Sequence, residues 1–207
     1  MDSYTTIQHQ AVFEYEDRKS VFIGEAMPVS CEADALDFIA YVKKKYPDAR
    51  HHVYAYVLRE NSIMRFSDDR EPQGTAGMPV LDVIRKNGCT DTVIVVTRYF
   101  GGTLLGTGGL VKAYTSSALG ALNGANIITY DLFSEIEITV SYSDYQKIST
   151  QLDTLGFHTD DIKYSDSVVI LGKAKKDITD EFIQKLTEIT AGRCNAQKIK
   201  EKFDFIS

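Results

Sequence analysis

The chain has 207 residues, of which 43% are hydrophobic, a length that can bury one large core or two smaller ones. Its formal net charge of −6 excludes a molecule that attracts nucleic acid over its whole surface, so any phosphate binding requires a local patch. Cys31, Cys89 and Cys194 include no close pair, which argues against a disulfide framework and a structural zinc site. No signal-peptide pattern or long apolar run occurs. We therefore expect a soluble cytoplasmic protein without a membrane segment.

The first part of the chain alternates strand-like and helix-like patterns. Alternating apolar residues over 11–29 predict two strands that meet at Asp17 and Arg18. Helical spacing predicts a helix over 32–46, which Pro47 ends. The same reasoning predicts strands at 51–60 and 62–67, a short helix at 79–88, a buried strand at 91–100 and a helix of small residues at 109–123.

The pattern changes near Tyr130, where we place a domain boundary that gives domains 1–130 and 131–207. The second part predicts a strand at 134–142, a helix at 143–156, strands at 158–166 and 167–176, a helix at 178–192 and a strand at 195–205. This βαββαβ order is that of a ferredoxin-like domain. The predicted fold class is therefore α+β with two domains.

The segment RYFGGTLLGTGGLVKAY, from Arg98 to Tyr114, joins the buried strand to the following helix through five glycines. It matches neither a Walker A loop nor G-x-G-x-x-G. Free N–H groups at a helix start favour an anion, and Arg98 and Lys112 are candidates to flank one. Alternatively, the glycines serve a tight turn and close packing. The candidate anion-binding or nucleic-acid-binding residues are Arg98, Tyr99, Gly101, Gly102, Thr103, Gly106, Thr107, Gly108, Gly109, Lys112 and Arg70.

A second group of polar residues lies in the segment RFSDDREPQGTAGMPVLDVI. Asp68, Asp69 and Glu71 are carboxylates that could bind a divalent cation or act as an acid/base pair. The same pattern also describes an ordinary turn that caps a helix. His51 and His52 begin a strand and point to opposite faces, so at most one of them can face a site.

The chain resembles the YigZ/IMPACT family. The resemblance rests on KSVFIGEAMPV, ARHHVYAY, FSDDREPQGTAGMPVLDVI and VIVVTRYFGGTLLGTGGLVKAYTSSALGAL. It implies an N-terminal domain similar to the second domain of ribosomal protein S5 and a C-terminal ferredoxin-like domain similar to late domains of elongation factor G. It also implies a link to translational control, with no firmly assigned enzymatic activity and no cofactor. The family's shared positions fall here on His51, Ser67, Asp68, Asp69, Glu71, Pro72, Gly74, Thr75, Ala76, Gly77, Arg98, Tyr99, Gly101, Gly102, Gly106, Gly108, Gly109, Leu110 and Lys112.

Arg70 departs from the family pattern, which usually has glycine at this position. Arginine prefers a negative φ, so we expect the turn to differ locally. Its charge also lies beside the carboxylates, which weakens a metal site and favours anion binding. We accordingly predict no metal site.

Two functions are compatible with these residues. In the first, the protein is a non-catalytic regulatory or binding protein whose segment 98–114 contacts RNA, the ribosome or a translation-associated protein. In the second, it is an enzyme acting on a small phosphorylated substrate. The glycine segment would then hold phosphate, and Asp68, Asp69, Glu71 and His51 would supply acid/base or metal-binding groups.

Overall fold

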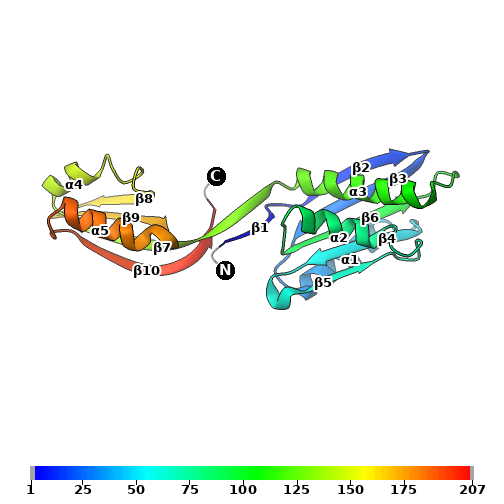
Figure 1. The fold of residues 1–207 in the computed structure, drawn as a ribbon, viewed down its shortest axis with the longest axis horizontal. Helices are drawn as coiled ribbons and strands as arrows, with labels where there is room; N and C mark the ends of the chain where they lie inside the picture. Colours follow the sequence, from blue (N-terminus) through cyan, green and yellow to red (C-terminus); the bar gives the residue numbers. More distant parts are fainter. Residues whose placement is uncertain (1–2, 206–207) are drawn as a thin grey trace. The chain divides into compact units, whose positions relative to one another are not determined.

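The computed structural model describes residues 3–205, and these divide into two compact units (Figure 1). One unit comprises Tyr4–Thr129, and the other begins at Tyr130 and also includes Ser3. The strand β7 (Ile127–Val140) contains Tyr130, so the chain passes from one unit to the other within a strand. The α+β class is confirmed.

The N-terminal unit is built on a five-stranded antiparallel sheet with the order β2-β3-β6-β4-β5. Its helices and strands are β1 (Ser3–Ile7), β2 (Ala11–Asp17), β3 (Ser20–Pro28), α1 (Glu32–Lys45), β4 (His51–Val57), η1 (Glu60–Ser62), β5 (Met64–Ser67), α2 (Gly77–Lys86), β6 (Thr92–Tyr99) and α3 (Gly106–Gly124). The predicted strands and helices are present. Strand β1, which pairs with β7, was not predicted because only a short, weakly patterned segment encodes it.

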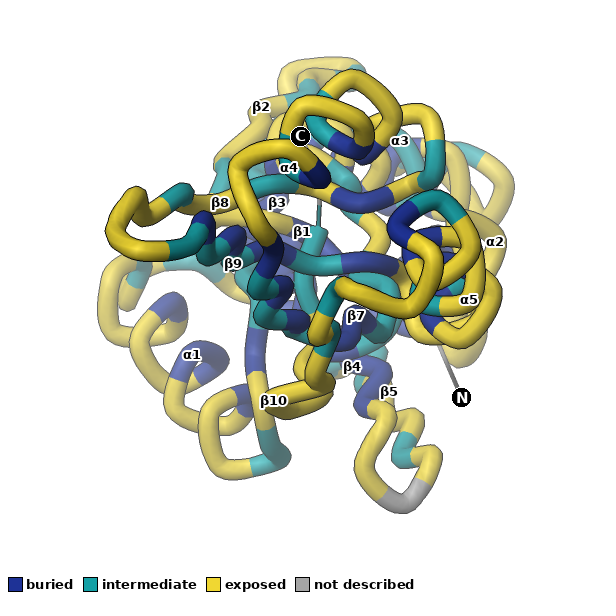
Figure 2. The backbone as a smooth tube through the Cα atoms, turned by 90° about the vertical axis from the view of Figure 1, so that its left-hand side faces the viewer, coloured by how far each residue is buried: buried dark blue, intermediate teal, exposed yellow. Residues whose placement is uncertain are grey.

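Two apolar layers cover the two faces of this sheet. Val93 and Val95 of β6 pack with Phe38 and Val42 of α1, while the alternate residues of β6 pack with α2 and α3. This alternation explains why the β6 sequence is almost continuously apolar. Most residues of the inner strand β4 are buried, whereas exposed residues dominate the loops and none is buried in the edge strand β2 (Figure 2).

Helix α3 begins at Gly106, three residues before the predicted start at Gly109. Glycine lowers helix propensity, so the sequence pattern did not extend the helix back through Gly106 and Gly108. As a result, Thr107, Gly108 and Gly109 belong to the first turn of α3 and not to the preceding loop.

The C-terminal unit has the predicted ferredoxin-like order of elements. After β7 come α4 (Tyr142–Ile148), β8 (Phe157–Tyr164), β9 (Val168–Lys175), η2 (Lys176–Ile178), α5 (Thr179–Ile189) and β10 (Asn195–Asp204). Strand β7 lies between β10 and β9, and β8 pairs with the other edge of β9. Helix α4 ends eight residues before the predicted limit at Gly156. The chain continues there in hydrogen-bonded turns that still bury Leu152.

The three cysteines are free, and Cys89 is buried, which raises the pKa of its thiol to about 11. No helix within residues 3–205 is long and apolar enough to cross a membrane.

Candidate functional site

The candidate site forms where β4 begins and β6 ends. These antiparallel strands pair with His51 opposite Arg98 and His52 opposite Thr97. The register therefore brings the histidine segment to the start of the glycine-rich segment. The loop that follows β5 reaches the same end of the sheet, because β5 pairs with β4.

A buried ion pair lies at the centre of this region. Nη1 of Arg98 donates to Oε1 of Glu71 over 2.6 Å, and the hydroxyl of Tyr114 donates to the same oxygen over 2.7 Å. Arg98 is only 6% exposed, and Tyr114 is fully buried. Burial and the neighbouring carboxylate strongly raise the pKa of Tyr114, so it remains a neutral donor. Arg98 thus lies in the interior and does not flank an open anion pocket.

The two histidines point to opposite faces, as predicted. Nδ1 of His51 lies 2.8 Å from the carbonyl oxygen of Asp69, and its Nε2 lies 4.0 Å from Oε1 of Glu71. Nδ1 of His52 lies 3.1 Å from Oγ1 of Thr97. Burial lowers the pKa of His52, which favours the neutral form. Only His51 therefore faces the Glu71 network.

Asp68 is engaged by backbone groups at the start of α2. Its carboxylate accepts N–H groups from Gly74 at 3.0 Å, Ala76 at 3.1 Å and Gly77 at 2.8 Å. These contacts correspond to the turn-and-cap interpretation of the segment, because they satisfy donors at a helix start. Gly77 also lies so close to Ser67 that a Cβ there would be 2.7 Å from the Ser67 carbonyl carbon.

Asp69 and the residues around it make further internal contacts. Its carboxylate accepts the His52 N–H over 2.6 Å, and its own N–H donates to the hydroxyl of Ser67 over 3.1 Å. The Thr75 hydroxyl donates to the Pro72 carbonyl over 2.7 Å. Because Asp68 and Glu71 are also engaged, the three carboxylates hold the loop together and are not directed jointly at a ligand.

Arg70 does not alter the turn in the way that the sequence suggested. It adopts a φ of 71°, in the left-handed region where glycine is favoured, and not the negative φ that arginine prefers. Its Nη2 donates to the Arg50 carbonyl over 2.8 Å, while 78% of its side chain remains exposed. The backbone therefore keeps a glycine-like conformation and presents a cation at the surface.

The glycine segment combines packing with an open helix start. A Cβ at Gly101 would lie 2.1 Å from the carbonyl carbon of Lys19, so glycine permits close approach of the β2–β3 turn. A Cβ at Gly108 would meet nothing within 4 Å. No side chain caps α3, and no acidic residue lies in its first turn. The other predicted residues of the segment are placed as follows: Gly102, Thr103, Gly106, Thr107 and Lys112 are exposed, Gly109 is half-buried, and Tyr99 donates to Asp48 over 3.2 Å.

The sequence analysis did not identify Arg18 and Lys19 as site residues. They form the two-residue turn between β2 and β3, with φ values of 48° and 65°. Arg18 Nη1 lies 3.5 Å from the Leu104 carbonyl oxygen, which fixes this turn beside the glycine segment. The sequence does contain a signal for these two residues. A two-residue hairpin turn usually contains asparagine and glycine, and this turn has neither.

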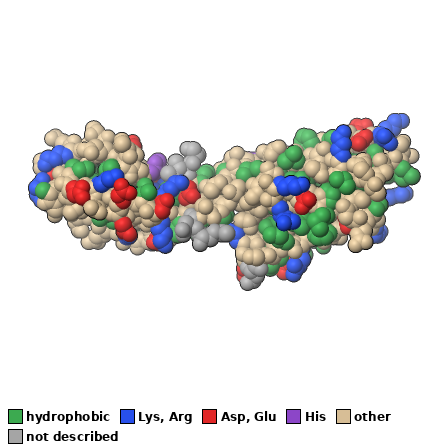
Figure 3. All heavy atoms as spheres, in the orientation of Figure 1, with side chains coloured by type: hydrophobic (Ala, Val, Ile, Leu, Met, Phe, Trp, Pro, Cys, Tyr) green, Lys and Arg blue, Asp and Glu red, His purple; other side chains and the backbone are tan. Residues whose placement is uncertain are grey.

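We call the surface at this end of the sheet the basic end; its exposed cations are Arg18 and Lys19 of the β2–β3 turn, Arg70 of the loop after β5 and Lys112 of α3. Lysine and arginine side chains gather at this end of the N-terminal unit, where Figure 1 shows the β2–β3 turn and the loop before α3 (Figure 3). Phe100 and Leu104 add exposed apolar surface, with 43% and 82% exposure. Of the nearby acids, Asp48 accepts the Tyr99 hydroxyl, whereas Asp69 lies 3.8 Å from Nε of Arg70 and partly offsets that cation.

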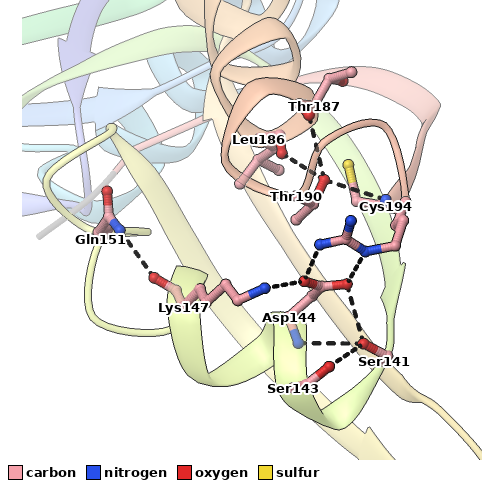
Figure 4. A network of polar contacts seen from close by, with 10 residues as sticks. Ser141, Ser143, Asp144, Lys147, Gln151, Leu186, Thr187, Thr190 and Cys194 are labelled. Atoms are coloured by element: carbon pink, nitrogen blue, oxygen red, sulfur yellow. Dashed lines mark hydrogen bonds and ion pairs between the residues drawn. The ribbon is translucent and has the colours of Figure 1, made fainter.

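The C-terminal unit contains a separate polar network around Asp144 (Figure 4). Nη2 and Nε of Arg193 donate to the two carboxylate oxygens over 2.8 and 2.9 Å, and Lys147 Nζ donates over 2.7 Å. Ser141 caps α4 by accepting the Asp144 N–H over 3.2 Å. Hydrogen bonds from Arg193, Lys147 and Ser141 hold the pKa of Asp144 well below its usual range. This network fastens α4 to the segment after α5.

The fold is that of an α+β protein with two units, and exposed cations gather at one end of the N-terminal unit. The Impact N-terminal domain model matches residues 18–122, and the model of a domain of unknown function, DUF1949, matches residues 138–193. The chain belongs to the IMPACT family, which supports a regulatory or binding role and confirms the resemblance seen in the sequence.

Similar proteins extend over nearly the whole chain. The IMPACT family member YvyE of Bacillus subtilis is 36% identical and covers 96% of this chain and 92% of its own length. The IMPACT family member YigZ of Escherichia coli is 32% identical and covers 90% of this chain and 93% of its own length. A crystal structure described as that of a hypothetical protein matches with a TM-score of 0.61 and 30% identity, covering 97% of this chain and 98% of the other.

Proposed function

We propose that this protein is a non-catalytic binding protein of the translation apparatus whose basic end binds the phosphate backbone of RNA. The observation that carries the proposal is the conformation of the exposed cations. Arg18, Lys19 and Arg70 all have positive φ values, of 48°, 65° and 71°. The cations thus occupy backbone positions for which glycine or asparagine is the less strained choice.

The β2–β3 turn contains two of these strained cations. A two-residue hairpin turn with two positive φ values strongly favours Asn-Gly. Arginine and lysine at these positions cost conformational energy, and such strain collects at functional sites. The side chains of Arg18 and Lys19 contribute exposed positive charge at the rim of the glycine segment. A functional requirement for that charge accounts for residues that the turn itself disfavours.

The glycine segment adds a second kind of anion-binding group. The first N–H groups of an α-helix have no partner within the helix and lie at the positive end of its dipole. At α3 these groups have neither a side-chain cap nor an acidic neighbour in the first turn. Gly108 leaves the adjacent space open, and Lys112 lies one helical turn further along the same exposed face. A phosphate at this place would meet both N–H groups and cations.

The overall charge of −6 limits RNA binding to this local surface. The link to translation is what the family resemblance implies, and the three free cysteines support the cytoplasmic location. The alternative enzymatic function has less support, because Asp68 and Glu71 accept hydrogen bonds from the protein itself. The same contacts give the loop a clear structural role.

The proposal can be tested with the variant Arg18→Asn/Lys19→Gly, which removes two charges and gives the turn its preferred residues. We expect full-length wild type to bind a 5′-labelled single-stranded RNA with an affinity that falls as salt increases. In the variant the affinity should fall at least fivefold, and the slope of log K against log salt should decrease by about 1.4 for two lost phosphate contacts. Fluorescence anisotropy measures both quantities.

The matched control is Lys163→Ala/Lys185→Ala, which removes two exposed lysines of the C-terminal unit. It should bind RNA as wild type does. Equal affinity of the turn variant and wild type for RNA at low salt would overturn the proposal. Because the turn variant is expected to be at least as stable as wild type, loss of binding cannot be attributed to unfolding.

A further inference from the structure

Strand β2 is an open edge of the N-terminal sheet, and one of its faces is uncovered. On the face opposite α2 and α3, helix α1 packs against β4 and β6, which leaves β2 and the adjoining part of β3 exposed. A groove of about 490 Å³ lies between α1 and the end of β3. Met27, Val29, Phe38 and Tyr41 form its apolar lining, and Asp34 and Asp37 lie at its rim.

The register of β2 places further acidic groups on this face. Val12 pairs with Glu25, whose side chain reaches Lys45 of α1 over 2.9 Å, so Val12 faces the side of the sheet that carries α1. Glu14 and Glu16 alternate with it on the same face, and both are exposed. Val12 is 52% exposed and Tyr41 54%. The edge and its groove thus combine exposed apolar surface with acidic groups.

Of the carboxylates near the groove, that of Glu25 is paired with a cation and the others are exposed. Hydrogen bonds from the Ser30 and Cys31 N–H groups hold the pKa of Asp34 below its usual value. Glu25 is paired with Lys45 and accepts from Gln10 over 3.3 Å. Lys45 is therefore engaged with the buried acid. Negative charge from Asp34, Asp37, Glu14 and Glu16 remains along the exposed surface.

This charge pattern selects among the possible occupants of the edge. If two copies paired antiparallel through β2 about Glu14, acidic side chains would lie directly opposite one another, which is destabilising. Charged residues on an edge strand oppose such self-association. A strand that carries lysine or arginine would instead place opposite charges against the same residues.

We infer that the β2 edge and the neighbouring groove bind a basic, extended peptide segment of a partner protein. The segment adds to β2 as a sixth strand, and backbone hydrogen bonds supply part of the affinity. Its apolar side chains cover Val12 and enter the groove, and its cations face Glu14 and Asp37. This site lies toward the start of β2, whereas the basic end lies at its far turn, so the inference is independent of RNA binding.

The test uses the full-length protein and a fluorescein-labelled nine-residue peptide with valine and lysine in turn at its odd positions and threonine at its even positions, so that valine and lysine lie on the same face of the added strand. We expect saturable binding by anisotropy, at least tenfold tighter than binding of the same peptide with glutamate in place of lysine. The variant Glu14→Lys/Asp37→Lys should weaken binding at least tenfold. The variant Asp153→Lys/Asp166→Lys makes the same charge change on exposed residues of the C-terminal unit and should leave binding unchanged.

A second peptide separates strand addition from simple charge attraction. N-methylation of alternate amides removes the donors that a strand presents to one neighbour but keeps every charge, so it should abolish binding in at least one of the two alternating patterns. Undiminished binding of both N-methylated peptides would overturn the inference, as would equal binding of the lysine and glutamate peptides. If analytical ultracentrifugation showed a wild-type dimer that Glu14→Lys dissociated, the edge would be assigned to a second copy of this chain. That result would also overturn the inference.

Discussion

The guanidinium of Arg98 and the carboxylate of Glu71 meet 2.6 Å apart, with 8% and 4% of their side chains exposed. Both charges are therefore buried, and the attraction between them offsets the free-energy cost of removing each from water. Tyr114 adds a hydrogen bond to Glu71 from the buried face of α3. This pair joins the carboxylate loop, the end of β6 and the helix that follows the glycine segment.

We predict that Arg98→Met lowers the free energy of unfolding by about 3–5 kcal/mol, because it leaves the Glu71 carboxylate buried without its counter-ion. Urea denaturation followed by circular dichroism measures the change. The double variant Arg98→Met/Glu71→Leu should recover much of the loss, since it removes both charges. A loss below about 1 kcal/mol in the single variant would mean that the pair is solvated and not structural.

Asp68 allows a second stability prediction. Asp68→Ala removes the acceptor of three backbone N–H groups at the start of α2 and should cost about 2 kcal/mol or more. Asp68→Asn keeps one oxygen acceptor and should cost less. Thermal unfolding of the two variants compares them directly. If Asp68→Ala and Asp68→Asn both left the melting temperature close to that of wild type, the carboxylate would not be the cap of this helix.

The sequence predicted the order of the elements well because their apolar patterns are strong, as in the continuous apolar run of β6 and the helical spacing of α1. It did not reveal the environment of Arg98, because the partner, Glu71, lies in a separate loop and the two meet only through the β4–β6 and β4–β5 registers. It located the turn at Asp17 and Arg18, but not the positive φ values of Arg18 and Lys19. Those angles follow from closing the hairpin in two residues, a constraint that residue pattern alone does not express.

The Asp144 network predicts a pH dependence in the C-terminal unit. The pKa of Asp144 is lowered in the folded state, chiefly by Arg193, so its contribution to stability is present above the unfolded pKa of about 3.9. That contribution is lost as pH falls through the folded pKa. The difference in melting temperature between wild type and Asp144→Asn should be greatest near pH 7, begin to shrink as pH falls through about 4, and continue to shrink at lower pH. A difference that stays constant over this range would show that ionisation of Asp144 is not involved.

The last prediction separates two glycines of the same segment. Gly108→Ala should raise the free energy of unfolding by about 0.5–1 kcal/mol, since the site is helical and a Cβ there meets nothing within 4 Å. The same change should weaken RNA binding if phosphate approaches the backbone at this position. Urea denaturation and RNA anisotropy on the same preparation measure both effects.

The control for this prediction is Gly101→Ala. Its Cβ would lie 2.1 Å from the Lys19 carbonyl carbon, so the β2–β3 turn must shift, and we expect a loss of about 1–3 kcal/mol. Gly101 thus has a packing role that accounts for glycine at its position, whereas Gly108 has no packing role. If Gly108→Ala were more stable and bound RNA as well as wild type, the backbone of α3 would not contact the phosphate, and binding at the basic end would depend on its side-chain cations alone.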